Sequence, residues 1–225
     1  MDVEILGGWK DQPFECADRK LQIRAAADPD RMLEQLMEGD NIPSAFRDPY
    51  WTKLWPASLS MARFLETRKA MLPTGTRCIE LGCGSGIPGL ALLALGCEVT
   101  FSDYVPEAVH LATWNALQNG LSPQESLVLD WHAPPNLKPF QAIVGSDLLY
   151  DATLHRPLLG TIRQLLDREG VCWMADAGRG PAGAFIDQAI VEGFTIDCYD
   201  ANGNAACAPG LKDFRVFELR FDVAR

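Results

Sequence analysis

The sequence predicts an α/β protein with a Rossmann-like, doubly wound and mostly parallel sheet of seven strands, ended at one edge by an antiparallel C-terminal hairpin. Short apolar runs that end in an acidic residue alternate with longer runs of helical spacing from Arg77 to Glu192. A glycine-rich turn, Gly82 to Gly89, follows the first of these runs. The last two strand-like runs have no helical run between them, which indicates an antiparallel return.

Composition places the chain among ordinary globular proteins. Its 225 residues are 48% hydrophobic and 22% charged, which fits one domain with a modest extension. No apolar stretch reaches the roughly 18 to 20 residues of a membrane span, so we expect no membrane partner. Seven cysteines without a repeated close pair suggest buried free thiols in an intracellular, cytoplasmic protein. The formal net charge of −10 disfavours a nucleic-acid partner.

The N-terminal part is expected to form an extension, residues 1–47, ahead of the main domain, residues 48–225. Residues 13–16 and 21–25 have the alternating character of a small hairpin. Asp28-Pro29-Asp30 offers an N-cap and a first-turn proline for a helix. This helix would carry four apolar residues at helical spacing: Met32, Leu33, Leu36 and Met37.

Residues 41–55 are rich in aromatic side chains, and prolines make the segment irregular. Two roles are open for these aromatics. They could form a small satellite core that caps the sheet, or they could form a lid or wall over a ligand cleft, because the segment enters the domain just before its first strand. Residues 58–69 are then predicted to form a helix with four residues facing inward: Leu59, Ala62, Phe64 and Leu65.

The alternating part of the chain supplies the sheet. The first strand ends at Glu80, and the helix after the glycine turn covers residues 90–95. Further strands are expected at residues 97–102, 126–129, 142–146 and 171–175, with helices at 106–119, 155–168 and 181–192. The last two strands are expected at residues 194–199 and 214–221. Acidic residues follow the ends of four strands, namely Asp103, Asp130, Asp147 and Asp176.

The glycine turn fits two ligand-binding patterns. Gly84 to Gly89 satisfies GxGxxG and is followed one strand later by Asp103, as in a dinucleotide site. Glu80 followed by Gly82, Gly84 and Gly86 forms the second pattern, an acid two residues before a GxGxG run. A buried acid would repel the pyrophosphate of a dinucleotide, whereas it can hold the ammonium group of S-adenosylmethionine. Glu80 therefore favours S-adenosylmethionine, although it could instead cap the turn that follows it.

The acids at the next two strand ends agree with this ligand. Asp103 can accept hydrogen bonds from ribose hydroxyls, although an NAD site would use the same position. Asp130 suits the exocyclic amine of adenine, and Trp131 offers an aromatic face for its ring. Each residue alone could be a helix cap or part of the core. Three acids in register with a glycine loop favour an adenosylmethionine site.

At these residues the chain resembles the seven-β-strand, class I S-adenosylmethionine-dependent methyltransferases, and within them the lysine methyltransferases of family 16. Residues 49–56, PYWTKLWP, resemble an aromatic segment of that group, and Asp130-Trp131 resembles its DW pair. Residues 146–150, SDLLY, resemble its DxxY motif. Residues 175–179, ADAGR, are similar to the GDPGR run of the electron-transfer-flavoprotein β-subunit lysine methyltransferases, with Ala177 in place of the proline.

The resemblance implies an enzyme that transfers a methyl group from S-adenosylmethionine. It puts Asp147 and Tyr150 beside the methyl acceptor, Asp147 to bind and orient it and Tyr150 to shape its pocket. It implies cofactor contacts at Trp55, Glu80, Gly82, Gly84, Gly86, Asp103, Tyr104, Asp130, Trp131 and Ser146. Methyl transfer from a sulfonium is a direct displacement, so no metal is expected, and the three scattered histidines have no metal-ligand spacing.

The acceptor implied by the resemblance is a lysine side chain of a protein substrate. A small-molecule amine of the nicotinamide kind is the alternative, because the aromatic stretch from Phe46 to Trp55 could enclose a small ring as readily as it frames a lysine. Two further classes stay open: an NAD-dependent oxidoreductase, and a protein that binds S-adenosylmethionine without turnover.

Overall fold

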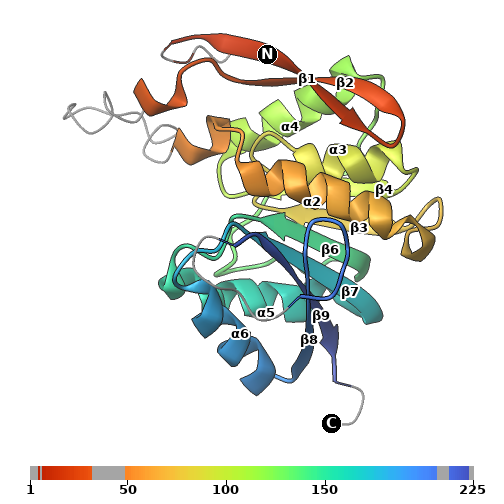
Figure 1. Ribbon diagram of the computed structural model, residues 1–225, viewed down its shortest axis with the longest axis vertical. Coiled ribbons are helices and arrows are strands. Elements are labelled where there is room, and N and C mark those ends of the chain that lie inside the picture. Colours follow the sequence, from red (N-terminus) through yellow and green to blue (C-terminus); the bar gives the residue numbers. More distant parts are fainter. Residues whose placement is uncertain (1–4, 6, 32–48, 207–212, 223–225) are drawn as a thin grey trace.

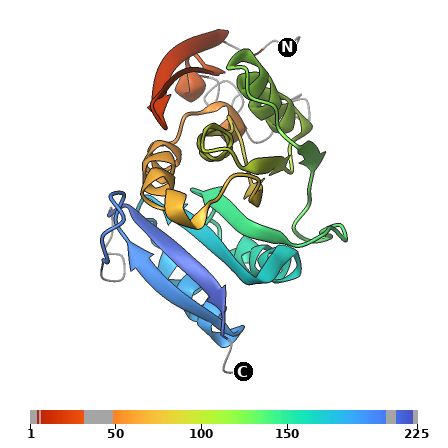
Figure 2. The ribbon, with the colours of Figure 1, turned by 90° about the vertical axis from the view of Figure 1, so that its right-hand side faces the viewer.

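The computed structural model describes residues 5, 7–31, 49–206 and 213–222. They form a seven-stranded sheet with helices on both faces and a separate two-stranded hairpin at the opposite end of the molecule from the C-terminal strands (Figures 1 and 2). No helix in this part of the chain is long and apolar enough to cross a membrane.

The sheet has the strand order β5-β4-β3-β6-β7-β9-β8. Its strands are β3 Arg77–Leu81, β4 Glu98–Asp103, β5 Glu125–Val128, β6 Phe140–Ser146, β7 Leu166–Asp176, β8 Phe194–Tyr199 and β9 Arg215–Phe221. Strands β3 to β7 pair in parallel, and β9 pairs antiparallel with both β7 and β8. The predicted doubly wound sheet with an antiparallel C-terminal hairpin is confirmed. The last strand, β9, pairs with β7 on one side and with β8 on the other, so that β8 forms the edge of the sheet.

The helices lie close to their predicted positions. They are α2 Pro56–Thr67, α3 Ile87–Ala94, α4 Pro106–Gln118, α5 His155–Leu165 and α6 Ala182–Val191, with short 3-10 turns at Pro49–Thr52, Lys69–Met71 and Ala152–Leu154. Proline opens α2 and α4, where a missing amide hydrogen costs nothing. Helix α5 ends three residues earlier than predicted, because Leu166 already pairs with Phe140 in the sheet.

Alternate strand residues point to opposite faces of the sheet and supply two cores. Cys78 in β3 packs in the core under α2, α3 and α4, and its neighbour Ile79 packs in the core under α5 and α6. Figure 1 shows the two helical layers on either side of the sheet. The largest fully buried side chain is Trp173, which contacts Phe64 of α2 at 6.0 Å between ring centroids.

The predicted N-terminal hairpin is present and is longer than the pattern indicated. It consists of β1 Trp9–Cys16 and β2 Arg19–Ala26. Ala17 and Asp18, both with positive φ, form a two-residue turn, the geometry that suits the twist of a hairpin. The hairpin packs against α4 and α2. It therefore stands outside the seven-stranded sheet, on the side of the molecule that carries the glycine turn.

The segment after the hairpin is described only at its ends. Residues 29–31 are helical, and the Asp28 carboxylate accepts a hydrogen bond from the Arg31 amide at 3.0 Å, so the predicted N-cap is confirmed. The rest of the predicted helix, with its four apolar residues, and residues 41–48 of the aromatic segment lie outside the described residues.

The prediction that Leu59 of α2 faces the core is wrong. Leu59 is 42% exposed. The buried stripe of the helix runs through Ser58, Met61, Ala62 and Leu65, which are spaced as one helical face. Leu59 lies outside that stripe and faces solvent.

This difference within one helix predicts two mutational outcomes. Phe64→Ala should lower the free energy of unfolding by about 3 to 5 kcal/mol, because it leaves a cavity beside Trp173. Leu59→Ala should change it by no more than about 0.5 kcal/mol. Urea unfolding followed by circular dichroism measures both. Equal losses in the two variants would contradict this packing.

Candidate active site

The predicted site residues gather at one edge of the sheet, where the carboxyl ends of the parallel strands meet. The glycine turn follows β3, Asp103 ends β4, Asp130 follows β5, and Ser146 ends β6. Neighbouring strands in this set are hydrogen-bonded partners. The structure therefore brings the four predicted ligand-binding stretches to adjacent positions.

The glycine turn requires glycine at alternate positions. Gly82, Gly84 and Gly86 have φ values of 59°, 50° and 82°, a region that other residues rarely adopt. A Cβ on Gly82 would lie 2.5 Å from Leu148, and one on Gly86 would lie 2.8 Å from Ala112. Glycine at these positions therefore lets the turn, a cradle of backbone, pack against Leu148 and Ala112 without a clash.

Glu80 lies beneath this turn and is buried, with 1% of its surface exposed. Its carboxylate accepts a hydrogen bond from the Gly89 amide at 2.9 Å. Glu80 therefore caps the first turn of α3, which is the alternative role that the sequence allowed for it. Burial raises the pKa of the Glu80 carboxyl well above its ordinary range, the Gly89 amide opposes that rise, and the charge of Asp103 adds to it.

Asp103 joins two loops of the site. Its Oδ2 accepts from the Gly84 amide and its Oδ1 from the Val105 amide, both at 3.0 Å. A carboxylate has several lone-pair sites, and a ligand hydroxyl is a donor of the kind that it accepts. Asp103 therefore fixes the glycine turn to the end of β4 in the position predicted for ribose binding.

The other predicted cofactor residues at this edge of the sheet differ in how far their side chains are exposed to solvent. Asp130 accepts from the backbone amide and the ring nitrogen of His132, and these bonds hold the pKa of its carboxyl below the ordinary value. Trp131 is partly buried against the core under α5, and Tyr104 is largely exposed. Ser146 is partly buried at the last position of β6.

A cleft of about 680 Å³ opens beside the end of β6. Asp147 and Tyr150, the two predicted acceptor residues, both line it, and so does the predicted cofactor residue Trp55. Its remaining lining residues are Lys53, Pro56, Ala177, Gly178, Arg179, Gly180 and Pro181. The structure thus joins the DxxY run, the aromatic segment and the ADAGR run in one cavity.

Asp147 is buried in the wall of this cleft and has a positive φ of 58°, a value that is uncommon outside glycine but that aspartate adopts more readily than most residues. Its amide donates to the Ala175 carbonyl at 2.8 Å, and its Oδ1 accepts from Arg179 Nε at 3.0 Å. Its Oδ2 is buried and has no hydrogen-bond partner among the described residues. One oxygen of Asp147 is therefore held by Arg179, and the other is a buried acceptor without a hydrogen-bond partner in the described part of the chain.

Arg179 and Asp176 are functional candidates that sequence reasoning did not assign. Asp176 Oδ1 accepts from the amides of Gly178 and Arg179, each at 2.7 Å. Burial raises the pKa of the Asp176 carboxyl, and the charge of Asp147 adds to this rise. The ADAGR run was the signal: its aspartate shapes the turn that directs the arginine to Asp147.

The two roles left open for the aromatic segment are filled by different residues. Trp51 is buried and packs against Ala108 and Leu111 of α4, as a satellite core requires. Trp55 instead lines the cleft, donates from its indole nitrogen to the Tyr50 carbonyl at 3.0 Å, and lies 5.2 Å from the Arg179 guanidinium. The segment is both a small core and a wall of the cleft.

Comparisons with known proteins agree with this geometry. A family model described as lysine methyltransferase matches residues 44–186. A histidine protein methyltransferase 1 homolog from Dictyostelium discoideum is 32% identical over 142 residues, which are 60% of this chain and 45% of the relative. An electron transfer flavoprotein beta subunit lysine methyltransferase from Xenopus laevis is 30% identical over 140 residues, 60% of this chain and 54% of the relative. The chain spans about half the length of these curated relatives.

A solved structure supports the fold. The TehB-like SAM-dependent methyltransferase from Corynebacterium glutamicum superposes with a TM-score of 0.58 at 18% sequence identity, covering 86% of this chain and 99% of that one. At 18% identity the likeness shows that the two proteins share a fold. The chemistry of this chain has to be inferred from its own site residues.

The burial of Glu80 yields a prediction that separates its two possible roles. A carboxyl group whose pKa is higher in the folded than in the unfolded protein stabilises the fold fully below its unfolded pKa, and this stability is lost as the pH rises through the folded pKa. Glu80→Gln cannot ionise, and its amide oxygen can still accept from Gly89. This variant should be at least as stable as the wild type near pH 8, because the wild type has by then lost stability that it has below the unfolded pKa of Glu80.

Binding of S-adenosylmethionine should respond differently to the same change. If Glu80 holds the ligand ammonium, Glu80→Gln should weaken binding by about tenfold or more. Urea unfolding at pH 4 and pH 8, together with isothermal titration calorimetry, measures both effects. An unchanged affinity of Glu80→Gln for S-adenosylmethionine would show that Glu80 only caps the turn.

Proposed function

We propose that this chain, which belongs to the lysine methyltransferase family whose model matches residues 44–186, transfers a methyl group from S-adenosylmethionine to a lysine side chain of a protein. The single observation that carries the proposal is the cleft at the end of β6. It places Asp147 and Tyr150 beside Trp55 and next to the strand edge that bears the glycine turn.

The glycine turn and the acids around it fit S-adenosylmethionine. The turn holds three glycines in a conformation that a side chain would strain, and the carboxylate of Asp103 is bound to the turn through the Gly84 amide. In this proposal Gly82, Gly84 and Gly86 face the amino-acid part of the ligand, Asp103 and Tyr104 face the ribose, and Asp130 and Trp131 face the adenine. When bound, S-adenosylmethionine supplies an electrophilic methyl group.

The cleft supplies what an amine acceptor needs. A lysine ammonium has an ordinary pKa of ~10.4, so forming its neutral amine near pH 7 costs roughly 4 to 5 kcal/mol. Asp147 lines the cleft, and its carboxylate would bind the acceptor nitrogen once its buried Oδ2, which has no partner among the described residues, is turned toward the cleft. The guanidinium of Arg179, paired with Oδ1 of the same carboxylate, offsets its negative charge and so favours the neutral amine over the ammonium.

This arrangement refines the assignment made from the sequence. Asp147 orients the acceptor nitrogen and Arg179 moderates the charge that Asp147 presents. Tyr150 and Trp55 shape the walls beside the aliphatic part of the acceptor. Displacement at the methyl group needs no nucleophile from the protein, so alignment is the main contribution of these residues and is worth up to ~7 to 11 kcal/mol for well-oriented groups.

A protein acceptor is favoured over a free small amine. The names of both relatives describe methyltransferases that act on proteins, and the cleft is open enough to admit a side chain from outside. Because one relative is named for histidine, a histidine acceptor is the outcome to separate from lysine. An acceptor of the nicotinamide kind, an NAD-dependent oxidoreductase and a binding protein without turnover are the other outcomes.

The first experiment tests ligand and acceptor class together. The protein should bind S-adenosylmethionine and show no comparable affinity for NAD in isothermal titration calorimetry. With tritiated S-adenosylmethionine and a cell lysate, it should label a protein band whose modified residue is lysine by mass spectrometry. Label confined to small metabolites, a modified histidine, or preferential binding of NAD would each contradict the proposal.

The second experiment tests the cleft residues. Asp147→Ala should lower methyl transfer by about a hundredfold, because the acceptor loses its orienting oxygen, and Tyr150→Phe should lower it to a smaller degree. Both variants should keep an affinity for S-adenosylmethionine within about threefold of the wild type. Asp187→Ala, an exposed aspartate of α6 outside the cleft, is the matched control. Methyl transfer at the control rate by both cleft variants would contradict their placement beside the acceptor.

A further inference from the structure

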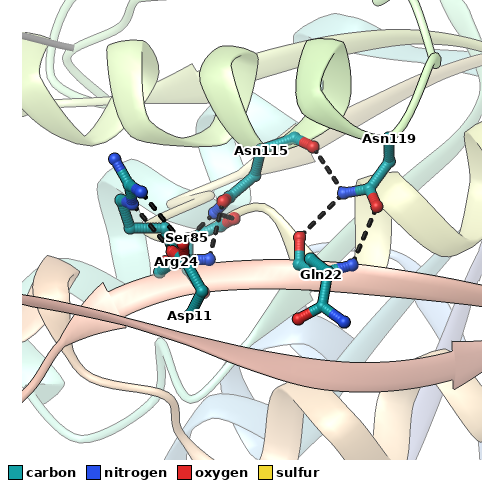
Figure 3. A network of polar contacts seen from close by, with 6 residues as sticks. All are labelled: Asp11, Gln22, Arg24, Ser85, Asn115 and Asn119. Atoms are coloured by element: carbon teal, nitrogen blue, oxygen red, sulfur yellow. Dashed lines mark hydrogen bonds and ion pairs between the residues drawn. The ribbon is translucent and has the colours of Figure 1, made fainter.

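Asn115 of α4 connects two parts of the molecule that are far apart in the sequence. Its side chain is completely buried. The amide oxygen accepts from the Arg24 amide at 2.8 Å, and the amide nitrogen donates to the Arg24 carbonyl at 3.2 Å and to the Ser85 carbonyl at 2.9 Å. Figure 3 shows this side chain between strand β2 and the glycine turn.

Asn119, one helical turn later, makes the same type of contact with the hairpin alone. Its amide oxygen accepts from the Gln22 amide and its amide nitrogen donates to the Gln22 carbonyl, both at 2.8 Å. The two asparagines thus satisfy alternate backbone groups along the outer edge of β2, as a neighbouring strand would. They differ in that Asn119 donates its second bond to the Asn115 carbonyl, whereas Asn115 donates to Ser85 (Figure 3).

The bond to Ser85 acts on the peptide group that joins Ser85 to Gly86. The carbonyl of this group accepts from Asn115, and its amide donates to the Cys83 carbonyl at 2.7 Å. Both polar ends of the peptide are therefore held. Because Gly84 and Gly86 flank this region with positive φ, a fixed peptide plane keeps both glycines in the conformation of the cradle.

The hairpin is anchored to the same region by other contacts. The Arg24 guanidinium forms an ion pair with Asp11 at 2.8 Å and lies 3.9 Å from the ring of Trp114 on α4. Trp9 of β1 contacts Trp51 at 6.2 Å between ring centroids. The Trp51 carbonyl lies so close to Gly84 that a Cβ there would approach it to 3.3 Å. The hairpin thus reaches the glycine turn through Asn115 and through Trp51.

We propose that Asn115 is a positioning residue for S-adenosylmethionine, which couples docking of the N-terminal hairpin to the shape of the glycine turn. This inference rests on the proposed function, because the ligand is the one assigned there. It gives the hairpin a role in cofactor affinity although the hairpin lies outside the seven-stranded sheet. Coupling of this kind is reciprocal, so the bound ligand must also stabilise the docked hairpin.

The test compares three variants of the full chain. Asn115→Ala removes contacts to both the hairpin and the turn, and Asn119→Ala removes contacts to the hairpin without touching the turn. Asn115→Asp keeps the acceptor for the Arg24 amide and loses the donors to the Arg24 and Ser85 carbonyls. Asn115→Ala and Asn115→Asp should each raise the Kd for S-adenosylmethionine by about tenfold or more, and Asn119→Ala by less than about threefold.

Kinetics separate positioning from general damage to the fold. For both Asn115 variants the KM for S-adenosylmethionine should rise, while kcat at saturating ligand should stay within about twofold of the wild type. Affinities of the Asn115 variants equal to that of Asn119→Ala would overturn the inference. So would a loss confined to kcat, which a cofactor-positioning role does not produce.

A third readout does not depend on ligand binding. Hydrogen exchange of the amides of residues 83–87 should be faster in Asn115→Ala and Asn115→Asp than in Asn119→Ala, and equal exchange in all three would overturn the inference. If the wild type binds no S-adenosylmethionine, the proposed function fails. The exchange experiment then still decides whether Asn115 fixes the glycine turn.

Discussion

The turn between β3 and α3 is the constraint on which the rest of the site depends. Gly82, Gly84 and Gly86 occupy a backbone region that a side chain would strain, and each lies against a different part of the protein. Leu148 after β6, Ala112 of α4 and the backbone of Trp51 close around them. The turn therefore sets the spacing between the cofactor edge, the acceptor cleft and the aromatic segment.

Buried charge is the main energetic cost of this site, and the protein offsets it locally. Glu80 receives a backbone amide, Asp176 receives two, and Asp147 receives the guanidinium of Arg179. Such bonds compensate only part of the cost of removing a carboxylate from water. Asp147 and Asp176 each keep one buried oxygen with no partner in the described part of the chain, and only Asp147 lines the cleft. Of these two aspartates, Asp147 is therefore the one that lies at the cleft.

Local patterns predicted the fold and the strand ends at which the candidate residues lie, because prolines, glycines and apolar periodicity act over a few residues. The seven strands, the N-terminal hairpin and the family resemblance are confirmed. The position of β9 between β7 and β8 depends on long-range pairing, which no local pattern encodes. The exposure of Leu59 depends on which face of α2 meets the sheet.

The contacts of Arg179 and Asn115 could not be predicted from local patterns either, because they join residues that are far apart in the sequence. Arg179 meets Asp147 across 32 positions, and Asn115 meets Arg24 across 91. Single polar residues of this kind have no periodicity, and their chemistry appears only when the fold brings their partners together. The roles of the individual cofactor and acceptor residues stay predictions that the variants described above address.

We propose that one strand edge holds S-adenosylmethionine with its reactive end directed to the cleft of Asp147 and Tyr150. A crystal structure of the chain with S-adenosylhomocysteine tests it most directly. The amino-acid end of the ligand should lie at Gly82 to Gly86, its ribose at Asp103, and its sulfur should face the cleft between Asp147 and Trp55. A ligand bound away from the glycine turn, or with its sulfur directed away from that cleft, would contradict it.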